Sequence, residues 1–131
     1  MIPKFRAWHK ELGRMMLIEI MYFFFFDNEL EELELNDPVM NDHISVYPNE
    51  IVLMQSTGLK DKNGKEIFEG DILKSNKYIT SVFYEKGAYC VKFRRTTNTT
   101  VTMNVISFIE KYKTKIVGNI YENPELLEAE G

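Results

Sequence analysis

Residues that could carry catalytic or metal chemistry are scarce in this sequence. His9 and His43 are the two histidines, and neither has a second ligand at the short spacings typical of zinc sites. Cys90 is the sole cysteine, so the chain offers no internal disulfide and no cysteine pair for a metal. No serine or cysteine stands with a histidine in a recognisable catalytic arrangement. We therefore predict no cofactor, no metal, no catalytic residue and no enzyme activity.

The densest group of carboxylates is Asp61, Glu66, Glu69 and Asp71, which fall within eleven residues. Carboxylates gathered in this way can hold Mg²⁺ in a nuclease. Lysines interleave with them here, as they do on a solvent-exposed hairpin, and surface charge is the commoner explanation. A metal-dependent nuclease is therefore a minor alternative.

The stretch GLKDKNGK at 58–65 has the glycines and lysine of a phosphate-binding loop but not their spacing. Five residues separate its glycines where the motif has four, and Glu66 stands where Ser or Thr would ligate Mg²⁺. The Asn63-Gly64 pair predicts a type I′ hairpin turn, whereas a phosphate loop leads from a strand into a helix. The sequence does not predict nucleotide binding at this loop.

Charge is segregated along the chain, although its total is only −4 from 16 basic and 20 acidic residues. Residues 27–42 contain seven acids and no base, and residues 74–115 contain nine bases and two acids. The two segments carry −7 and +7. Such segments can be solvated surfaces, or they can attract one another within a molecule or between subunits. Whether the acidic segment masks the basic one stays open at this point.

Part of the basic segment has the composition of a nucleic-acid-binding sheet. Lys92, Arg94 and Arg95 can contact phosphates, and Tyr89 on the same strand, with Tyr78 and Tyr84 nearby, can stack on bases. The simpler interpretation is a charged strand face exposed to solvent. We therefore carry nucleic-acid binding through Lys92, Arg94, Arg95 and Tyr89 as an alternative hypothesis.

The most apolar stretch is MMLIEIMYFFFF at 15–26, which is too short for a membrane-spanning helix of about 20 residues. It also lacks the flanks of a signal peptide. We interpret it as a strand whose four consecutive phenylalanines need cover on both faces, so it predicts self-association into a homo-oligomer. With one cysteine, the expected location is a reducing compartment such as the cytoplasm, without membrane association.

Hydrophobic alternation and turn residues predict mostly strands. In the first half we expect strands at 3–8, 15–26, 44–47 and 51–54, with a turn at 10–13. Residues 28–35, NELEELEL, fit a short helix or an exposed strand, and we favour the helix. In the second half we expect strands at 78–84, 88–93, 101–109 and 115–121, and a helical turn after Asn123.

These elements predict a mainly β fold with one or two short helices. The strands over 66–121 fit a small SH3-like barrel, and a two-layer antiparallel β sandwich is the other option. We treat residues 1–131 as one domain. An N-terminal β layer at 1–58 contains the acidic segment, and residues 59–131 form the barrel half and the C-terminal helical turn.

Three blocks of the sequence carry a family likeness. IPKFRAW at 2–8, TGLKDKNGKEIFEGDI at 57–72 and VGNIYENPELL at 117–127 resemble the YopX-like proteins of phages and prophages. The blocks occur in order and reach both ends of the chain, while residues 15–49 do not align. The resemblance implies a mainly β fold and a phage origin, and it implies no established activity.

These observations together predict a phage-encoded accessory protein that acts by binding rather than by catalysis. The expected partner is a host protein or a second copy of the chain. The alternative partner is nucleic acid, bound by the basic residues of 74–115.

Overall fold

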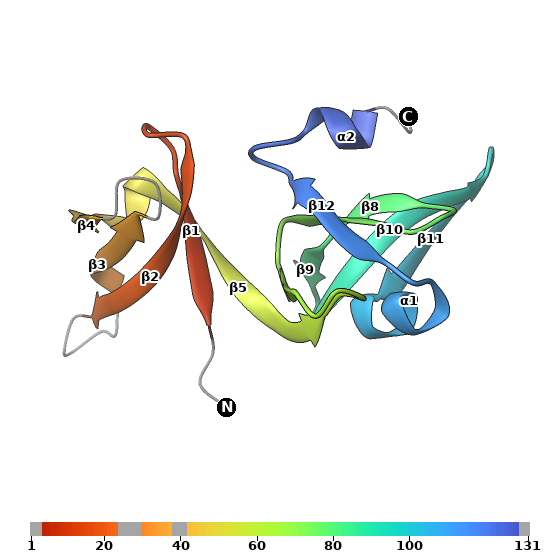
Figure 1. Ribbon diagram of the computed structural model, residues 1–131, viewed down its shortest axis with the longest axis horizontal. Helices are drawn as coiled ribbons and strands as arrows, with labels where there is room; N and C mark the ends of the chain where they lie inside the picture. The colour runs from red at the N-terminus through yellow and green to blue at the C-terminus, as the bar shows by residue number, and fades with distance from the viewer. Residues whose placement is uncertain (1–3, 24–29, 38–41, 129–131) are drawn as a thin grey trace. The chain divides into compact units, whose positions relative to one another are not determined.

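The structure is a computed structural model that describes residues 4–23, 30–37 and 42–128 (Figure 1). The described residues are mainly β, with two short α-helices, as the sequence predicts. Every strand pair is antiparallel. The chain divides into two compact units, Met1–Gln55 and Ser56–Gly131. We call them unit 1 and unit 2.

Unit 1 is one sheet in the order β4-β3-β2-β1-β5. Its strands are β1 (Phe5–His9), β2 (Arg14–Phe23), β3 (Leu30–Asp37), β4 (Asp42–Val46) and the first half of β5 (Ile51–Lys60), which follows the 3-10 helix η1 (Pro48–Glu50). The predicted turn at 10–13 joins β1 to β2, and there the Gly13 N–H donates to the His9 carbonyl at 2.8 Å. Strand alternation buries Ala7, Met16 and Leu35 on one face of this sheet.

The helix that we favoured at 28–35 is wrong over its described residues, 30–35, because they belong to strand β3. Leu33 and Leu35 are fully buried, and they alternate with Glu32 and Glu34. This spacing of two residues suits a sheet with one covered face, and β2 and β4 pair with β3 on both sides. Tertiary pairing therefore outweighed the weak helical spacing of the leucines.

The apolar run at 15–26 forms strand β2 as far as Phe23, as predicted. Residues 24–26 lie outside the described residues, as do the side chains from Glu19 onward in this strand. Self-association through the four phenylalanines therefore stays a prediction. In the described part of the chain, no helix has the length and apolar character needed to cross a membrane.

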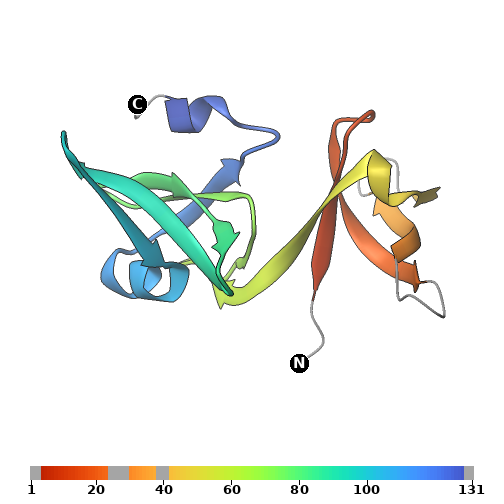
Figure 2. The ribbon, with the colours of Figure 1, turned by 180° about the vertical axis from the view of Figure 1, so that it is seen from behind.

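Unit 2 contains two three-stranded sheets, which Figure 2 shows from the opposite side to Figure 1. One sheet has the order β12-β7-β8 and the other β11-β10-β9. The second half of β5 pairs with β6. The remaining elements are β6 (Glu66–Phe68), β7 (Asp71–Lys74), β8 (Ile79–Ser81), β9 (Phe83–Glu85), β10 (Ala88–Thr96), β11 (Thr99–Asn104), α1 (Val105–Lys111), β12 (Lys115–Asn119) and α2 (Glu125–Glu128).

The strands of unit 2 fit the two-layer sandwich that was the second option, and not the SH3-like barrel that we put first. The single strand predicted at 78–84 is interrupted at Val82, so β8 pairs with β7 while β9 pairs with β10. The strand predicted at 101–109 is also wrong beyond Asn104, where α1 begins. Val105 and Phe108 are buried three residues apart, which is the spacing of a helix face. Among the described residues the sheets do not close into a barrel.

The predicted turn at Asn63-Gly64 exists, but its type I′ geometry is wrong. Of the described non-glycine residues only Lys86 has a positive φ, so Asn63 does not have the conformation that type I′ requires. Lys86 (φ 50°) and Gly87 (φ 85°) both have the positive φ that type I′ requires, and Glu85 pairs with Ala88 on either side of them. The type I′ pattern is therefore found in the β9–β10 hairpin.

Gly64 is needed for its backbone conformation alone. Its φ is 80°, and an added Cβ would meet no atom within 4 Å. We expect Gly64→Val to lower the free energy of unfolding by about 1 to 3 kcal/mol, because a β-branched residue is strained in the left-handed region. Urea melts would measure the loss. Gly64→Asn should cost less, since Asn tolerates this conformation, and an equal cost for both variants would contradict the explanation.

Candidate nucleic-acid interface

Two of the predicted basic residues lie together on strand β10. Lys92 and Arg94 are two residues apart, so their exposed side chains share one face of the sheet. The Thr80 hydroxyl fixes the backbone beneath them by donating to the Lys92 carbonyl at 2.8 Å and accepting its N–H at 3.2 Å. Both side chains line a shallow groove of about 420 Å³ that also contains Phe83 and Leu127.

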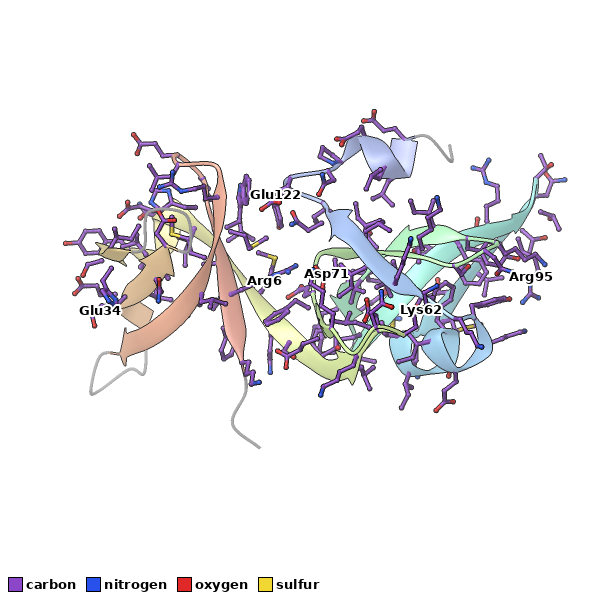
Figure 3. All side chains as sticks on the ribbon, viewed as in Figure 1. Arg6, Glu34, Lys62, Asp71, Arg95 and Glu122 are labelled. Atoms are coloured by element: carbon purple, nitrogen blue, oxygen red, sulfur yellow. The ribbon has the colours of Figure 1, made fainter. Side chains whose placement is uncertain are left out.

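The other two predicted residues do not join that face. Tyr89 alternates with Lys92 along β10, so it lies on the opposite face, half-buried, with its ring 5.1 Å from that of Tyr84. Burial and the negative charge of Glu69 raise the pKa of Tyr89 above its ordinary value. Arg95 falls in the irregularity between Arg94 and Thr96, near the outer end of the β10–β11 hairpin (Figure 3). Tyr89 therefore cannot stack a base held by Lys92 and Arg94.

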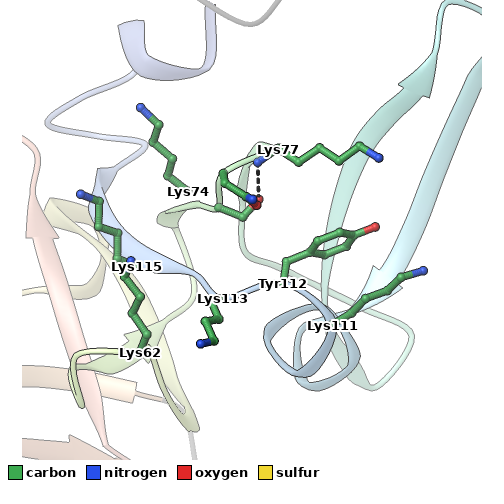
Figure 4. Close-up of a pocket in the computed structure, with 9 residues that line it drawn as sticks. Lys62, Lys74, Lys77, Lys111, Tyr112, Lys113 and Lys115 are labelled. Atoms are coloured by element: carbon green, nitrogen blue, oxygen red, sulfur yellow. Dashed lines mark hydrogen bonds between the residues drawn. The ribbon is translucent and has the colours of Figure 1, made fainter.

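A larger basic group surrounds a hollow elsewhere in unit 2 (Figure 4). We call it the lysine pocket. It has a volume of about 710 Å³, and within the part of the chain that the structure describes no carboxylate lines it. Those residues are Lys62, Lys74, Ser75, Asn76, Lys77, Lys111, Tyr112, Lys113 and Lys115.

Three stretches of the chain bring these lysines together, at 62, 74–77 and 111–115. Lys74 of β7 and Lys115 of β12 are directly paired in their sheet. Lys111 ends α1, and Lys113 lies in the short connection from α1 to β12. Lys62 lies in the β5–β6 turn. The Lys62 N–H donates to the Thr114 carbonyl at 2.9 Å, and this hydrogen bond fixes the turn beside the start of β12.

The turn that carries Lys77 is held by a serine. The buried Ser75 hydroxyl accepts hydrogen bonds from the N–H groups of Lys77 at 3.1 Å and Tyr78 at 2.9 Å, and the first of these is drawn in Figure 4. These hydrogen bonds fix the backbone on this side of the pocket, while the Lys77 side chain is exposed, with its ammonium 5.6 Å from the Tyr78 ring centroid.

Asp61 is the residue that joins the β5–β6 turn to β12. One carboxylate oxygen accepts the N–H groups of Asn63 at 2.9 Å and Lys65 at 2.8 Å, and the other accepts the Ile116 N–H at 2.9 Å. Burial opposes ionisation of this group, but the three N–H donors outweigh it and hold the pKa of Asp61 below its ordinary value. Asp61 thus positions two pocket lysines: Lys62, which follows it in the chain, and Lys115, which precedes its hydrogen-bond partner Ile116.

The electrostatics of the lysine pocket favour an anion. Within the described residues, none of its six lysines is paired with a carboxylate, and all six are exposed. The Lys111 ammonium lies 5.7 Å from the Tyr112 ring centroid. By sequence, unit 1 has four bases and ten acids and unit 2 has twelve bases and ten acids, giving −6 and +2. The acidic segment at 27–42 lies partly outside the described residues.

The carboxylates that could have formed a magnesium site have structural contacts instead. Asp61 makes the three contacts above, and the buried Asp71 accepts the Phe68 N–H at 2.8 Å. Among the described residues, no three side chains of the His, Cys, Asp and Glu types come together as a metal site.

Five of the six pocket lysines belong to the basic segment at 74–115, but their spacing in the sequence does not group them. From its sequence, Lys62 is expected on a solvated hairpin. The sequence KYKTK at 111–115 was an available signal, because lysines at every second residue flank an aromatic ring. Nothing local connects Lys62 or Lys74 to this sequence, so their membership depends on the fold.

Comparison with known proteins is consistent with this architecture. The model of the YopX family, described as "YopX protein", matches residues 4–128. The chain belongs to the YopX family. This YopX-family protein is also similar to the crystal structure of protein EF1440 from Enterococcus faecalis, with a TM-score of 0.63 and 32% identity over 97% of this chain and 99% of that chain. Among curated proteins, none matches.

Proposed function

We propose that this YopX-family protein acts by binding rather than by catalysis, and that its ligand is a nucleic acid whose phosphates enter the lysine pocket. The observation that carries the proposal is that six lysines, none paired with a carboxylate among the described residues, line one hollow of about 710 Å³. The protein is proposed to serve as a phage accessory factor in the cytoplasm of the host.

The chemistry of the pocket supports phosphate as the group recognised. Lysine ammonium groups are compact charges with three donors each, and they bind phosphate oxygens without requiring one orientation. Because these lysines are exposed, their ammonium groups stay hydrated in the free protein. Six like charges around one hollow nevertheless repel each other. A polyanion relieves this repulsion and releases its own counterions on binding.

A host protein or a second copy, which the sequence favours, is supported less directly. Those partners were inferred from the run at 15–26, most of whose side chains lie outside the described residues. The groove beside Lys92 and Arg94 is smaller, and these two are the basic residues among the described side chains that line it. Because of the lysine pocket, we propose nucleic acid as the ligand in preference to a host protein or a second copy, the partners that the sequence favoured.

The proposal predicts salt-dependent binding of labelled DNA by the intact protein. Fluorescence anisotropy at increasing salt from about 50 mM should give a linear fall of log K against log salt, with a slope of about −0.7 to −0.9 per phosphate contact. Replacing the paired residues, Lys74→Gln with Lys115→Gln, should make the slope less steep by about 1.5 and weaken binding at least tenfold at low salt.

Two exposed lysines outside the pocket provide the matched control. Lys60→Gln with Lys86→Gln removes the same charge from unit 2 without touching the pocket lining. This control should keep most of the affinity. Equal losses in the two double variants would show that net charge, rather than the pocket, binds DNA. Failure of the wild-type protein to bind at 50 mM salt would remove the proposal.

A further inference from the structure

We infer that the lysine pocket selects single-stranded over double-stranded nucleic acid by stacking a base on Tyr112, an inference that rests on the proposed function. The first supporting observation is shape. A hollow of about 710 Å³ lies in the size range of sites that enclose small ligands. A single strand can place an unpaired nucleotide inside it. A duplex keeps its bases paired and stacked, so it would contact only lysines at the rim.

The second observation is an aromatic wall. Tyr112 is half-buried and lines the pocket, and it lies in sequence between Lys111 and Lys113. Figure 4 shows its ring between the side chains of Lys77 and Lys111. Bases of every type stack on aromatic rings, so this wall would bind unpaired bases without sequence preference once the exposed Lys111 ammonium, 5.7 Å from the ring centroid, moves to a phosphate.

The Tyr112 ring is held in place before any ligand arrives. It meets the ring of Tyr78 edge-on at 5.3 Å, and it packs against Phe108 at 5.2 Å and Phe93 at 6.3 Å between centroids. A ring fixed by three neighbours loses little conformational freedom when a base stacks on it. The flanking lysines can then contact the phosphates on either side of that base.

Two probes with equal numbers of phosphates separate the alternatives. One is labelled oligothymidylate, which stays unpaired, and the other is a labelled DNA hairpin whose bases are almost all paired. At about 50 mM salt the wild-type protein should bind the single strand at least tenfold more tightly. Tyr112→Leu should weaken single-strand binding by about 5- to 100-fold and leave hairpin binding and the salt slope unchanged. Tyr112→Phe, which retains the ring, is the matched control.

A second measurement uses the wild-type protein, because Tyr112 also packs in the core and Tyr112→Leu could unfold unit 2. Oligothymidylate carrying 5-iodouracil should cross-link under ultraviolet light to the peptide that contains Tyr112. Equal affinity for the two probes, tighter hairpin binding, or cross-links confined to other peptides would overturn the inference while leaving phosphate binding intact. Binding of neither probe would instead overturn the proposed function.

Discussion

Replacing Asp61 by alanine is expected to lower the free energy of unfolding by about 3 to 5 kcal/mol, measured by urea melts followed by circular dichroism. The carboxylate is buried and accepts three backbone N–H groups, from Asn63, Lys65 and Ile116. Alanine would remove all three hydrogen bonds, and each hydrogen bond to a charged group contributes about 1.5 to 3 kcal/mol. The loss should loosen the β5–β6 turn from β12, and with it the arrangement of Lys62 and Lys115.

Two variants make this result specific. Glu110→Ala removes an exposed carboxylate from α1 and should change stability by less than about 0.5 kcal/mol. The loss of unfolding free energy for Asp61→Asn should lie between those for Asp61→Ala and Glu110→Ala. The asparagine amide oxygen can still accept from the N–H groups of Asn63 and Lys65, but its NH₂ group would face the Ile116 N–H. A loss for Asp61→Ala no larger than that for Glu110→Ala would contradict the structural role.

The same carboxylate should make stability depend on pH. Its hydrogen bonds hold the pKa of Asp61 below the value in the unfolded chain, which is about 3.9. The stabilisation is therefore fully present above the unfolded pKa and is lost as the pH falls through the folded pKa. The difference in unfolding free energy between wild type and Asp61→Asn should be constant from pH 7 to about 5 and shrink below about pH 4. A difference that stays constant down to pH 2 would contradict this mechanism.

Charge reversal at the lysine pocket is expected to have the largest effect on binding. Lys113→Glu with Lys115→Glu should weaken DNA binding at least a hundredfold at about 50 mM salt, because two phosphate contacts become two repulsions. Both side chains are exposed, so the melting midpoint should change little. Anisotropy titrations with labelled DNA would measure the loss.

Reversal on strand β10 is the matched comparison. Arg94→Glu with Arg95→Glu changes the net charge by the same amount, and Figure 3 shows Arg95 well away from Lys62. Only a long-range charge effect is expected there, about tenfold or less, and salt should screen it. If the β10 reversal instead abolishes binding and the pocket reversal does not, the interface lies on β10, as the sequence hypothesis had it.

Much of the fold could be predicted from local patterns. The turn at 10–13, the strands of β4, β10 and β12, and the helical turn after Asn123 follow from alternation and turn residues acting over a few positions. The turn at Asn63-Gly64 was located correctly, since glycine in the left-handed region marks such turns. Membership of the YopX family was also visible in three sequence blocks that span the chain.

Tertiary structure decided what local patterns leave ambiguous. Residues 30–37 are strand because β2 and β4 pair with them, although their leucines also fit a helix. β8 and β9 separate at Val82 because each pairs with a different strand. The type of the turn at 61–65 depends on Asp61, whose contact with Ile116 spans 55 residues.

The candidate site shows the same division most clearly. The sequence by itself determined that unit 2 is rich in lysine and that 111–115 alternates lysine with Tyr112 and Thr114. Only the fold brings Lys62 and Lys74 to that segment, through the pairing of β7 with β12 and the Asp61 contacts. The fold also separates Tyr89 from Lys92 and Arg94, because neighbouring positions of a strand point to opposite faces. Long-range backbone hydrogen bonds are not encoded in residue spacing, and they determine which charges share a surface.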